Sequence, residues 1–409
     1  MTKKPSYRFA DYTEPWADKK LGELVERVTR KNKNLESDLP LTISAQYGLI
    51  DQETFFNKKV ASKDVSGYYL LKKGEFAYNK SYSSDYPWGA VKRLDNYEMG
   101  VLSTLYIVFR PNSIDSDFLA VYYDSPKWYK EVSMRAAEGA RNHGLLNISP
   151  QDFFDTELIF PVNQSEQTAI GSFFQDIDQL ISLQQRKLEV LKEQKKTYLK
   201  LLFPAKGQKK PSLRFVGFED EWKEVKLGEY ANYRRGSFPQ PYGKKEWYGG
   251  EESMPFVQVI DVTDNLALVN DTKQKISKQA QPKSVLVPQG TVIVTLQGSI
   301  GRVAITHYDT YVDRTLLIFE SYNFPTHIGF WAYTIQNIFE IERQKAPGGT
   351  IKTITKEALS SFEISIPSLP EQEAIGSFFQ DLDKAIAKQE EKVNQLKESK
   401  RTLLRKMFI

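Results

Sequence analysis

Short polar runs rich in Arg, Lys, Asn, Gln and Ser interrupt the sequence, and these side chains are suited to binding nucleic acid. Arg and Lys can pair with guanine edges and Asn or Gln with adenine, while Lys and Ser commonly hold phosphates. In the first half of the chain the candidates are Ser44, Gln46, Tyr47, Asn79, Lys80, Ser81, Tyr82, Lys92, Arg93, Arg141, Asn142 and His143. In the second half they are Arg234, Arg235, Gln258, Thr295, Gln297, Ser299, Arg302, Lys345 and Lys352. Surface loops are ordinarily polar, so these residue types alone make DNA binding only a candidate.

No arrangement of residues points to catalysis or to a metal. The sequence has no Walker A loop, no H-E-x-x-H and no G-x-S-x-G, and it lacks the Asn/Asp-Pro-Pro-aromatic signature of adenine methyltransferases. With no cysteine and only three scattered histidines, we expect no catalytic residue, metal or cofactor in the chain. The acid pairs Asp176/Asp178 and Asp381/Asp383 are interpreted as carboxylates in the first turns of helices, where the helix dipole favours them.

Composition narrows the class of protein. A chain of 409 residues suits two or three domains, and its net charge of +4 permits nucleic acid without requiring it. The first residues contain no apolar run of the secretory type, and eighteen apolar residues never run together. We therefore expect a cytoplasmic protein without a membrane partner.

The sequence contains an internal repeat, which includes the elements expected to position these residues. Residues 166–178 and 371–383 are identical at 11 of 13 positions, and extending the match to Phe203 and Phe408 gives 21 identities over 38 positions. Residues 3–23 match 209–229 with 11 identities in 21. Between these anchors the halves diverge, although residues 100–109 and 310–319 are similar in pattern. Each half is therefore predicted to be a variable globular region followed by a shared helix.

Both shared segments have the heptad spacing of a coiled coil. The first places apolar residues at Ile170, Phe174, Ile177, Ile181, Leu188, Leu191, Tyr198 and Leu202, with Gln184 and Lys195 filling the gaps. The second repeats this with Ile375, Phe379, Leu382, Ile386, Val393, Leu396, Leu403 and Met407, and with Gln389 and Lys400. We predict that the two helices pack on one another in antiparallel orientation. The alternative is two amphipathic helices on separate cores.

The outer faces of these helices are basic. Residues 179–203 hold six Lys or Arg against two acidic residues, and residues 384–409 hold eight against three. A solvated helix face and a contact with DNA phosphates or an acidic partner explain this equally well.

The variable regions mix strands with helices. Residues 106–110, 290–296 and 314–320 predict strands, and residues 117–137 and 327–344 predict helices that follow them. The fold class is thus α+β: two globular domains of similar fold joined by two long antiparallel coiled-coil helices in a pseudo-two-fold, duplicated architecture. The predicted parts are residues 1–162, a first helix over 163–204, a linker over 205–212, a second globular domain over 213–368 and a second helix over 369–409.

With these features in place, the sequence resembles the specificity subunits of Type I restriction–modification systems. The resemblance is carried by E-Q-x-A-I-G-S-F-F at the start of each long helix, by W-x-x-x-K-L-G-E ending at Glu23 and Glu229, and by GSIGRVAIT over 298–306. It implies two target recognition domains, each reading one half of a bipartite, asymmetric site on double-stranded DNA. It also implies a coiled coil that sets the spacer between the half-sites.

The resemblance further implies partners that do the chemistry. Two modification subunits would hold S-adenosylmethionine and methylate adenine, and restriction subunits would use ATP and Mg²⁺ to translocate and cleave DNA. The chain itself would be no enzyme. We expect Phe173 and Phe378, beside the seam, to contact partners, although both also suit the core. The rival functions are a coiled-coil structural protein without DNA specificity and a stand-alone DNA-modifying enzyme.

Overall fold

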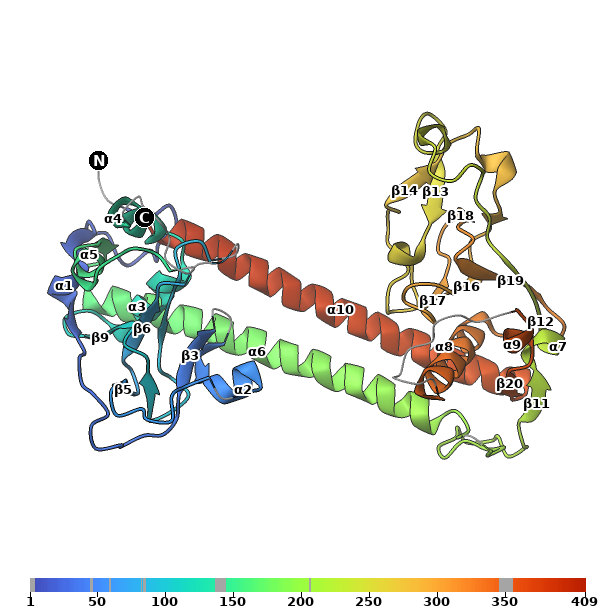
Figure 1. Cartoon of the computed structure of the whole chain (residues 1–409), viewed down its shortest axis with the longest axis horizontal. Helices are drawn as coiled ribbons and strands as arrows, with labels where there is room; N and C mark the ends of the chain where they lie inside the picture. Colours follow the sequence, from blue (N-terminus) through green and yellow to red (C-terminus); the bar gives the residue numbers. More distant parts are fainter. Residues whose placement is uncertain are drawn as a thin grey trace. The chain divides into compact units, whose positions relative to one another are not determined.

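The computed structural model (Figure 1) describes residues 4–44, 47–58, 60–81, 83, 86–136, 145–205, 207–345 and 356–409, without the side chains of 343–345, 356 and 357. The chain divides into two compact units. Unit 1 comprises Met1–Gln185 and Glu391–Ile409, and unit 2 comprises Arg186–Glu390. Each unit therefore contains one globular region, the beginning of one long helix and the end of the other.

Unit 1 is built around a four-stranded antiparallel sheet. Its strand order is β2 (Val25–Arg27), β9 (Ile107–Pro111), β6 (Phe76–Asn79) and β7 (Ala90–Arg93). Three two-stranded ladders accompany it: β1 (Ala17–Lys20) with β10 (Glu157–Phe160), β3 (Leu41–Ser44) with β4 (Gly48–Asp51), and β5 (Tyr69–Lys72) with β8 (Met99–Leu102). The short helices are α1 (Leu21–Leu24), α2 (Gln52–Phe56), α3 (Ser116–Asp124), α4 (Tyr129–Arg135) and α5 (Pro150–Phe154).

Unit 2 repeats the same sheet and adds a second one. The repeated sheet has the order β12 (Ala231–Arg235), β19 (Leu316–Tyr322), β16 (Val292–Thr295) and β17 (Val303–Ile305). The second sheet has the order β14 (Gln274–Ile276), β13 (Met254–Val257), β18 (Thr310–Val312) and β15 (Leu286–Val287), with β13 and β18 parallel. A ladder of β11 (Lys223–Lys226) and β20 (Glu363–Ile366) corresponds to β1 and β10. The helical segments are α7 (Leu227–Tyr230), η2 (Lys245–Trp247), η3 (Val259–Asp261), η4 (Gln281–Lys283), α8 (Ile328–Lys345) and α9 (Lys356–Ser360).

The matching sheets confirm the duplicated α+β fold. In unit 1 the central strands are β9, which was predicted, and β6, which precedes the variable hairpin. In unit 2 they are β19 and β16, which were both predicted, and β16 precedes the variable hairpin. The predicted helix over 327–344 is α8, whereas the helix predicted over 117–137 is split into α3 and α4. Pro126 lies in the gap, and proline disfavours helical backbone in the residue before it.

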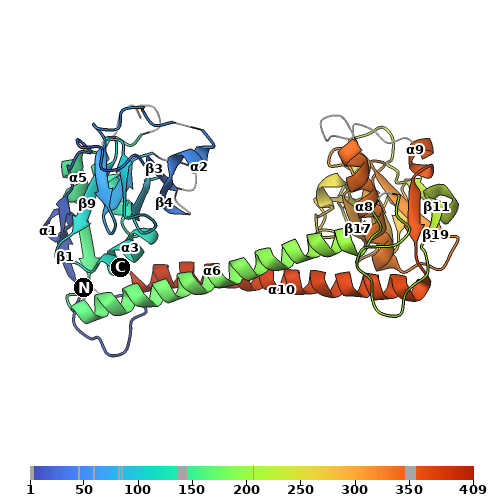
Figure 2. The ribbon, with the colours of Figure 1, turned by 90° about the horizontal axis from the view of Figure 1, so that it is seen from below.

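The two long helices are α6 (Gln164–Leu201) and α10 (Leu369–Met407), of 38 and 39 residues. Inside unit 2, Lys192 Nζ lies 2.7 Å from Glu390, and Lys195 Nζ lies 2.6 Å from Asp383. Inside unit 1, Lys397 Nζ donates to Gln185 Oε1 at 3.0 Å. In each unit the start of one helix thus lies along the end of the other, as Figure 2 shows, and the antiparallel prediction is confirmed.

The two lysines of the seam, Lys195 and Lys400, form ion pairs. All predicted apolar seam residues are buried or half-buried. Lys400 Nζ lies 2.7 Å from Asp178 of α6, in the arrangement that Lys195 and Asp383 form in unit 2. The placement of Asp176/Asp178 and Asp381/Asp383 in first helical turns was wrong, because α6 begins at Gln164 and α10 at Leu369, several turns earlier. Asp178 and Asp383 instead pair with lysines of the other long helix.

The repeated E-Q motif is structural. Arg8 donates two hydrogen bonds of 2.6 Å to the fully buried carboxylate of Glu166, and Arg214 donates two of 2.7 Å to Glu371. Gln167 accepts from the backbone N–H of Asp115 at 2.7 Å, which fixes the start of α3 against α6. The repeated sequences therefore join each globular region to the helix that leaves it.

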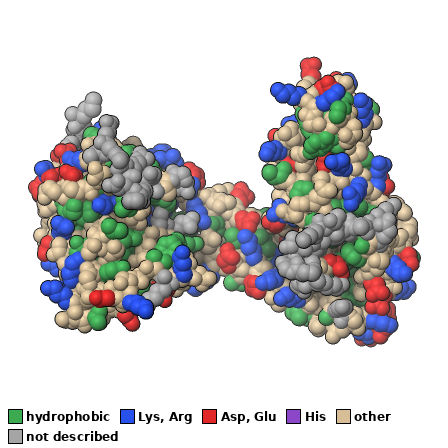
Figure 3. Space-filling view, in the orientation of Figure 1, with side chains coloured by type: hydrophobic (Ala, Val, Ile, Leu, Met, Phe, Trp, Pro, Cys, Tyr) green, Lys and Arg blue, Asp and Glu red, His purple; other side chains and the backbone are tan. Residues whose placement is uncertain are grey.

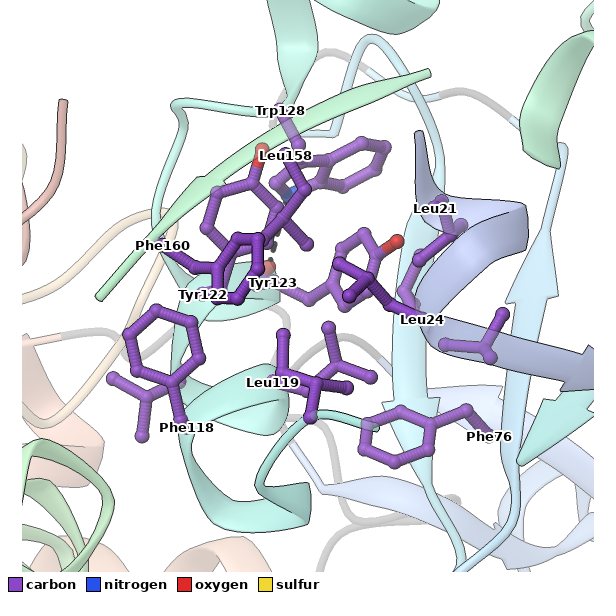
Figure 4. Packing of buried hydrophobic residues seen from close by; sticks show 14 of the residues in the cluster. Leu21, Leu24, Phe76, Phe118, Leu119, Tyr122, Tyr123, Trp128, Leu158 and Phe160 are labelled. Carbon is purple, nitrogen blue, oxygen red and sulfur yellow. Dashed lines mark hydrogen bonds between the residues drawn. The ribbon is translucent and has the colours of Figure 1, made fainter. Parts of the chain in front are cut away.

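The cores of the two units lie beside these joints. Figure 4 shows the core of unit 1, where Phe118 and Tyr122 of α3, Leu21 of α1 and Phe76 of β6 pack together with Phe160. Leu404 and Met407 at the end of α10, with Phe408 directly after it, belong to this core. Leu202 and Phe203, directly after α6, belong to the core of unit 2.

Candidate nucleic-acid interface

Two hairpin loops occupy the same place in the two repeated sheets. One joins β6 to β7 in unit 1, and the other joins β16 to β17 in unit 2. Their sequences are unrelated, although the strands on either side pair alike. A shared sheet with divergent loops presents different side chains from one scaffold.

The unit 2 hairpin is held by a buried threonine. Thr295 is fully buried, and its hydroxyl donates to the carbonyl of Ser299 and accepts from the N–H of Arg302 at 3.0 Å. Its side chain therefore shapes the loop and faces no ligand. The same bonds leave Gln297 and Ser299 exposed at the tip.

The other candidates of unit 2 lie on separate elements. Arg302 Nε lies 2.9 Å from Asp264. Arg234 and Arg235 are exposed on β12, and Arg234 lies 3.9 Å from Glu320 across the sheet. Gln258 is half-buried and caps η3. Among the described candidates of unit 2, only Gln297, Ser299 and Arg302 belong to one loop.

The candidates of unit 1 divide in a similar way. Ser81 is exposed, and its N–H donates to Asn79 Oδ1 at 3.0 Å. Lys80 Nζ lies 3.4 Å from the carbonyl of Ile148. Ser44 is buried at the end of β3, where its Oγ accepts from the N–H of Tyr47 at 3.2 Å, whereas the Tyr47 ring is exposed.

Two predicted cations of unit 1 are held in ion pairs. Lys92 Nζ lies 2.6 Å from Asp124, and Arg93 lies 2.7 Å from Asp117. Burial alone would lower the pKa of Arg93, but the hydrogen bond to Asp117 and the nearby Asp95 raise it. Burial likewise opposes ionisation of Asp124, yet Lys92 and Lys400 hold its pKa below the ordinary value. Both cations therefore hold α3 and the loop after β7 to the sheet.

Seven predicted contacts lack described side chains. Lys345 is the last residue of α8, and its side chain lies outside the described residues. The others outside the described part of the chain are Gln46, Tyr82, Arg141, Asn142, His143 and Lys352.

The two predicted partner-binding aromatics are partly covered by their own units. Phe173 is half-buried, with its ring edge-on to Phe9 at 5.6 Å. Phe378 is half-buried between Tyr198, at 5.1 Å, and Phe215, at 5.8 Å. Each leaves only part of its ring for another molecule.

On the face that Figure 3 shows, charge alone does not mark an interface. Lys and Arg side chains there are interspersed with Asp and Glu over both units. One local feature was not predicted from the sequence: a cleft of 1310 Å³ lies inside unit 2, between the hairpin loop and the long helices. Lys192, Lys196 and Lys200 of α6 line it, four residues apart along the helix. This four-residue spacing was the feature of the sequence that could have indicated a basic wall.

The described residues offer few other functional features. They contain no group of His, Cys, Asp or Glu that could hold a metal ion. None of the helices in the described ranges combines the length and apolar character needed to cross a bilayer.

Comparison with known proteins finds similarity to one family over part of the chain. The family model described as Type I restriction modification DNA specificity domain matches residues 219–398. The MjaX type I restriction enzyme specificity subunit of Methanocaldococcus jannaschii is 25% identical over 252 residues, which cover 58% of this chain and 55% of the relative. The EcoprrI specificity subunit of Escherichia coli is 24% identical over 154 residues, or 37% of each chain. The matches thus span about half of the first relative and less of the second.

Solved structures share the fold over nearly the whole chain. The Type I S subunit of M. genitalium superposes with a TM-score of 0.59 at 16% identity, covering 99% of both chains. A chain from a study of complex assembly in the type I R-M system has the same TM-score at 18% identity, covering 97% of this chain and 99% of its own. The duplicated sheets and paired helices are thus the fold of these Type I subunit structures, and residues 219–398 carry the match to the specificity-domain model.

Proposed function

We propose that the chain is the non-catalytic DNA-specificity subunit of a Type I restriction–modification complex. Each unit reads one half of a bipartite, asymmetric DNA site, and α6 and α10 set the spacer between the halves. The observation that carries this proposal is the pair of unrelated hairpin loops on matching sheets. One scaffold with two different tips suits two different half-sites.

The contacts with bases come from the exposed loop residues. In unit 2 these are Gln297 and Ser299, which share one tip, and in unit 1 they are Ser81 and Tyr47. We assign Arg234, Arg235 and Lys80 to the DNA backbone, since phosphate contacts position a protein whereas base contacts give specificity. Four other candidates make contacts inside their own units and support the base-reading loops: Thr295, Ser44, Lys92 and Arg93.

Partners supply the chemistry. Two modification subunits bring S-adenosylmethionine and methylate adenine, and restriction subunits bring ATP-dependent translocation and cleavage with Mg²⁺. The half-exposed rings of Phe173 and Phe378, at the openings of the two long helices, remain the proposed partner contacts. Only part of each ring is available, so the interface must also use neighbouring positions on the helices.

The test is a methylome. The chain is expressed with its cognate modification subunit in a host free of DNA methylation, and methylated adenines are mapped by sequencing. We expect an interrupted, two-part motif that is methylated only when the chain is present. Formation of the complex without such a motif would contradict the proposal and favour a structural protein. Methylation by the purified chain alone would instead favour a stand-alone enzyme.

A further inference from the structure

The cleft inside unit 2 has a basic wall that the proposed readers do not use. Lys192, Lys196 and Lys200 lie on one face of α6, because residues four apart share a helix face. Lys196 is 66% exposed, and its ion pair with Glu193 is loose, at 3.9 Å. Lys200 is also exposed. Exposed pairs of this kind hold a side chain only weakly, so both ammonium groups can reach a ligand.

The opposite wall is the β16–β17 hairpin. Gly298, Ser299 and Arg302 line the cleft across from the lysines. Among the described residues, the N–H groups of Gly298 and Ser299 make no hydrogen bond. The cleft therefore places unused backbone donors opposite exposed ammonium groups, and this combination suits an anion.

Charge and size indicate what kind of anion fits. The lining contains six basic side chains and three acidic ones, and Lys195 and Lys192 are paired with Asp383 and Glu390. Even so, the wall keeps an excess of positive charge. At 1310 Å³ the cleft exceeds the roughly 300–1,000 Å³ of small-molecule pockets. An extended polyanion fits this space better than a single small ion.

The duplication repeats the basic positions in α10, together with several of their neighbours. Lys192, Lys196 and Lys200 correspond to Lys397, Arg401 and Arg405 of α10, 205 residues later. Two of the three residues differ in type, yet the charge is kept. Positive charge is thus kept at all three positions, as phosphate binding requires.

We propose that this stripe of α6 binds the DNA phosphodiester backbone beside the half-site read by the unit 2 hairpin, and that Lys397, Arg401 and Arg405 do the same in unit 1. This inference rests on the proposed function. The hairpin tip carries the base contacts of Gln297 and Ser299, while the helix holds the adjacent phosphates. The long helices then contribute sequence-independent affinity in addition to the spacing of the readers.

The test compares the full-length chain with its Lys196→Gln/Lys200→Gln variant, each in complex with its cognate modification subunit. Binding is measured over a range of salt concentrations on two duplexes of equal length, one with the motif recovered from the methylome and one shuffled. We expect weaker binding to both duplexes, and a salt slope smaller by about 0.9 for each phosphate that the variant no longer neutralises. The ratio of motif to shuffled affinity should stay the same.

A matched control is Lys223→Gln/Lys226→Gln. These lysines are exposed on β11 of the same unit, outside the cleft, and their replacement removes the same charge. Equal effects of the two double variants would overturn the assignment, because long-range charge alone would then explain them. A changed motif would also overturn it, by making the lysines base readers. If the wild-type complex fails to prefer the motif duplex, the proposed function fails instead.

Discussion

The ring of Phe408 lies 5.6 Å from the ring of Phe118, so the end of the chain closes the core of unit 1. Phe203 takes the same position against Phe330 in unit 2, with ring centroids 5.5 Å apart. The two phenylalanines are 205 residues apart and equivalent in the repeat. Each ends the long helix that begins in the other unit, so each unit needs residues from both halves of the sequence.

This relationship predicts that Phe408→Ala destabilises unit 1 selectively. Truncation of a buried Phe typically lowers the free energy of unfolding by about 3–5 kcal/mol. Hydrogen–deuterium exchange, followed peptide by peptide, should show faster exchange in β6 and α3 and unchanged exchange in β16 and α8. Phe203→Ala is the matched variant and should give the reverse pattern. Equal loosening of both units by either variant would contradict the existence of two separately closed cores.

The buried ion pair at the first joint gives a second prediction. Glu166 is fully buried, and Arg8 is its partner in two hydrogen bonds. Glu166→Gln leaves the guanidinium without a counter-charge, and breaking a buried pair typically costs about 3–5 kcal/mol. Asp155→Asn, which removes an exposed partner of Lys20, should cost less than about 1 kcal/mol. Denaturant unfolding measures both, and similar losses of stability would show that the joint at Glu166 is not important for folding.

Periodicity and repetition predicted the architecture, but not the residues that complete the two cores. The heptad spacing predicted α6, α10 and their packing on one another, since apolar seams leave a regular record in the sequence. The ion-pair partners of the two seam lysines were not predicted. Asp178 and Asp383 were interpreted as first-turn carboxylates, although they lie several turns inside the helices predicted over 163–204 and 369–409, and the role of Phe408 depends on contacts that no local pattern records. The second sheet of unit 2 consists of strands of two to four residues, too short for an alternation signal.

The site was harder to predict, because residue type does not reveal burial. Thr295 and Gln297 were equally suited to base contacts, yet the first is fully buried and the second exposed. Their difference comes from the turn that the Thr295 hydroxyl organises. Arg93 has the chemistry of a guanine reader, but Asp95 and Asp117 lie beside it in the fold.

A third prediction concerns pH. His327 precedes α8, and its Nδ1 accepts a hydrogen bond from the N–H of Phe330 at 3.2 Å, which requires the unprotonated nitrogen. Burial lowers the pKa of His327, with Glu373 opposing the shift. The folded state therefore binds a proton more weakly than the unfolded chain, so this stabilisation is complete above about pH 6.5 and is lost as the pH falls below it.

The measurement is the denaturant stability of unit 2 between about pH 5 and about pH 8. Stability should rise with pH in the wild type, and His327→Asn should flatten the rise because an amide oxygen can accept the same bond without titrating. An unchanged pH dependence in the variant would assign the effect to another group.

The last prediction concerns the division of labour between the hairpins. Gln297→Ala/Ser299→Ala should relax or change one half of the methylated motif and leave the other half intact, because the two tips belong to separate units. Removing a good base contact takes away roughly 1–3 kcal/mol of discrimination. Replacing residues 24–147 with the same region of a relative should change only the other half. Methylome sequencing measures both, with Ser361→Ala as the control, since Ser361 is exposed in unit 2 away from the hairpin. Alteration of both halves by either change would mean that the units do not read DNA independently, because each change leaves the sheet and hairpin of the other unit untouched.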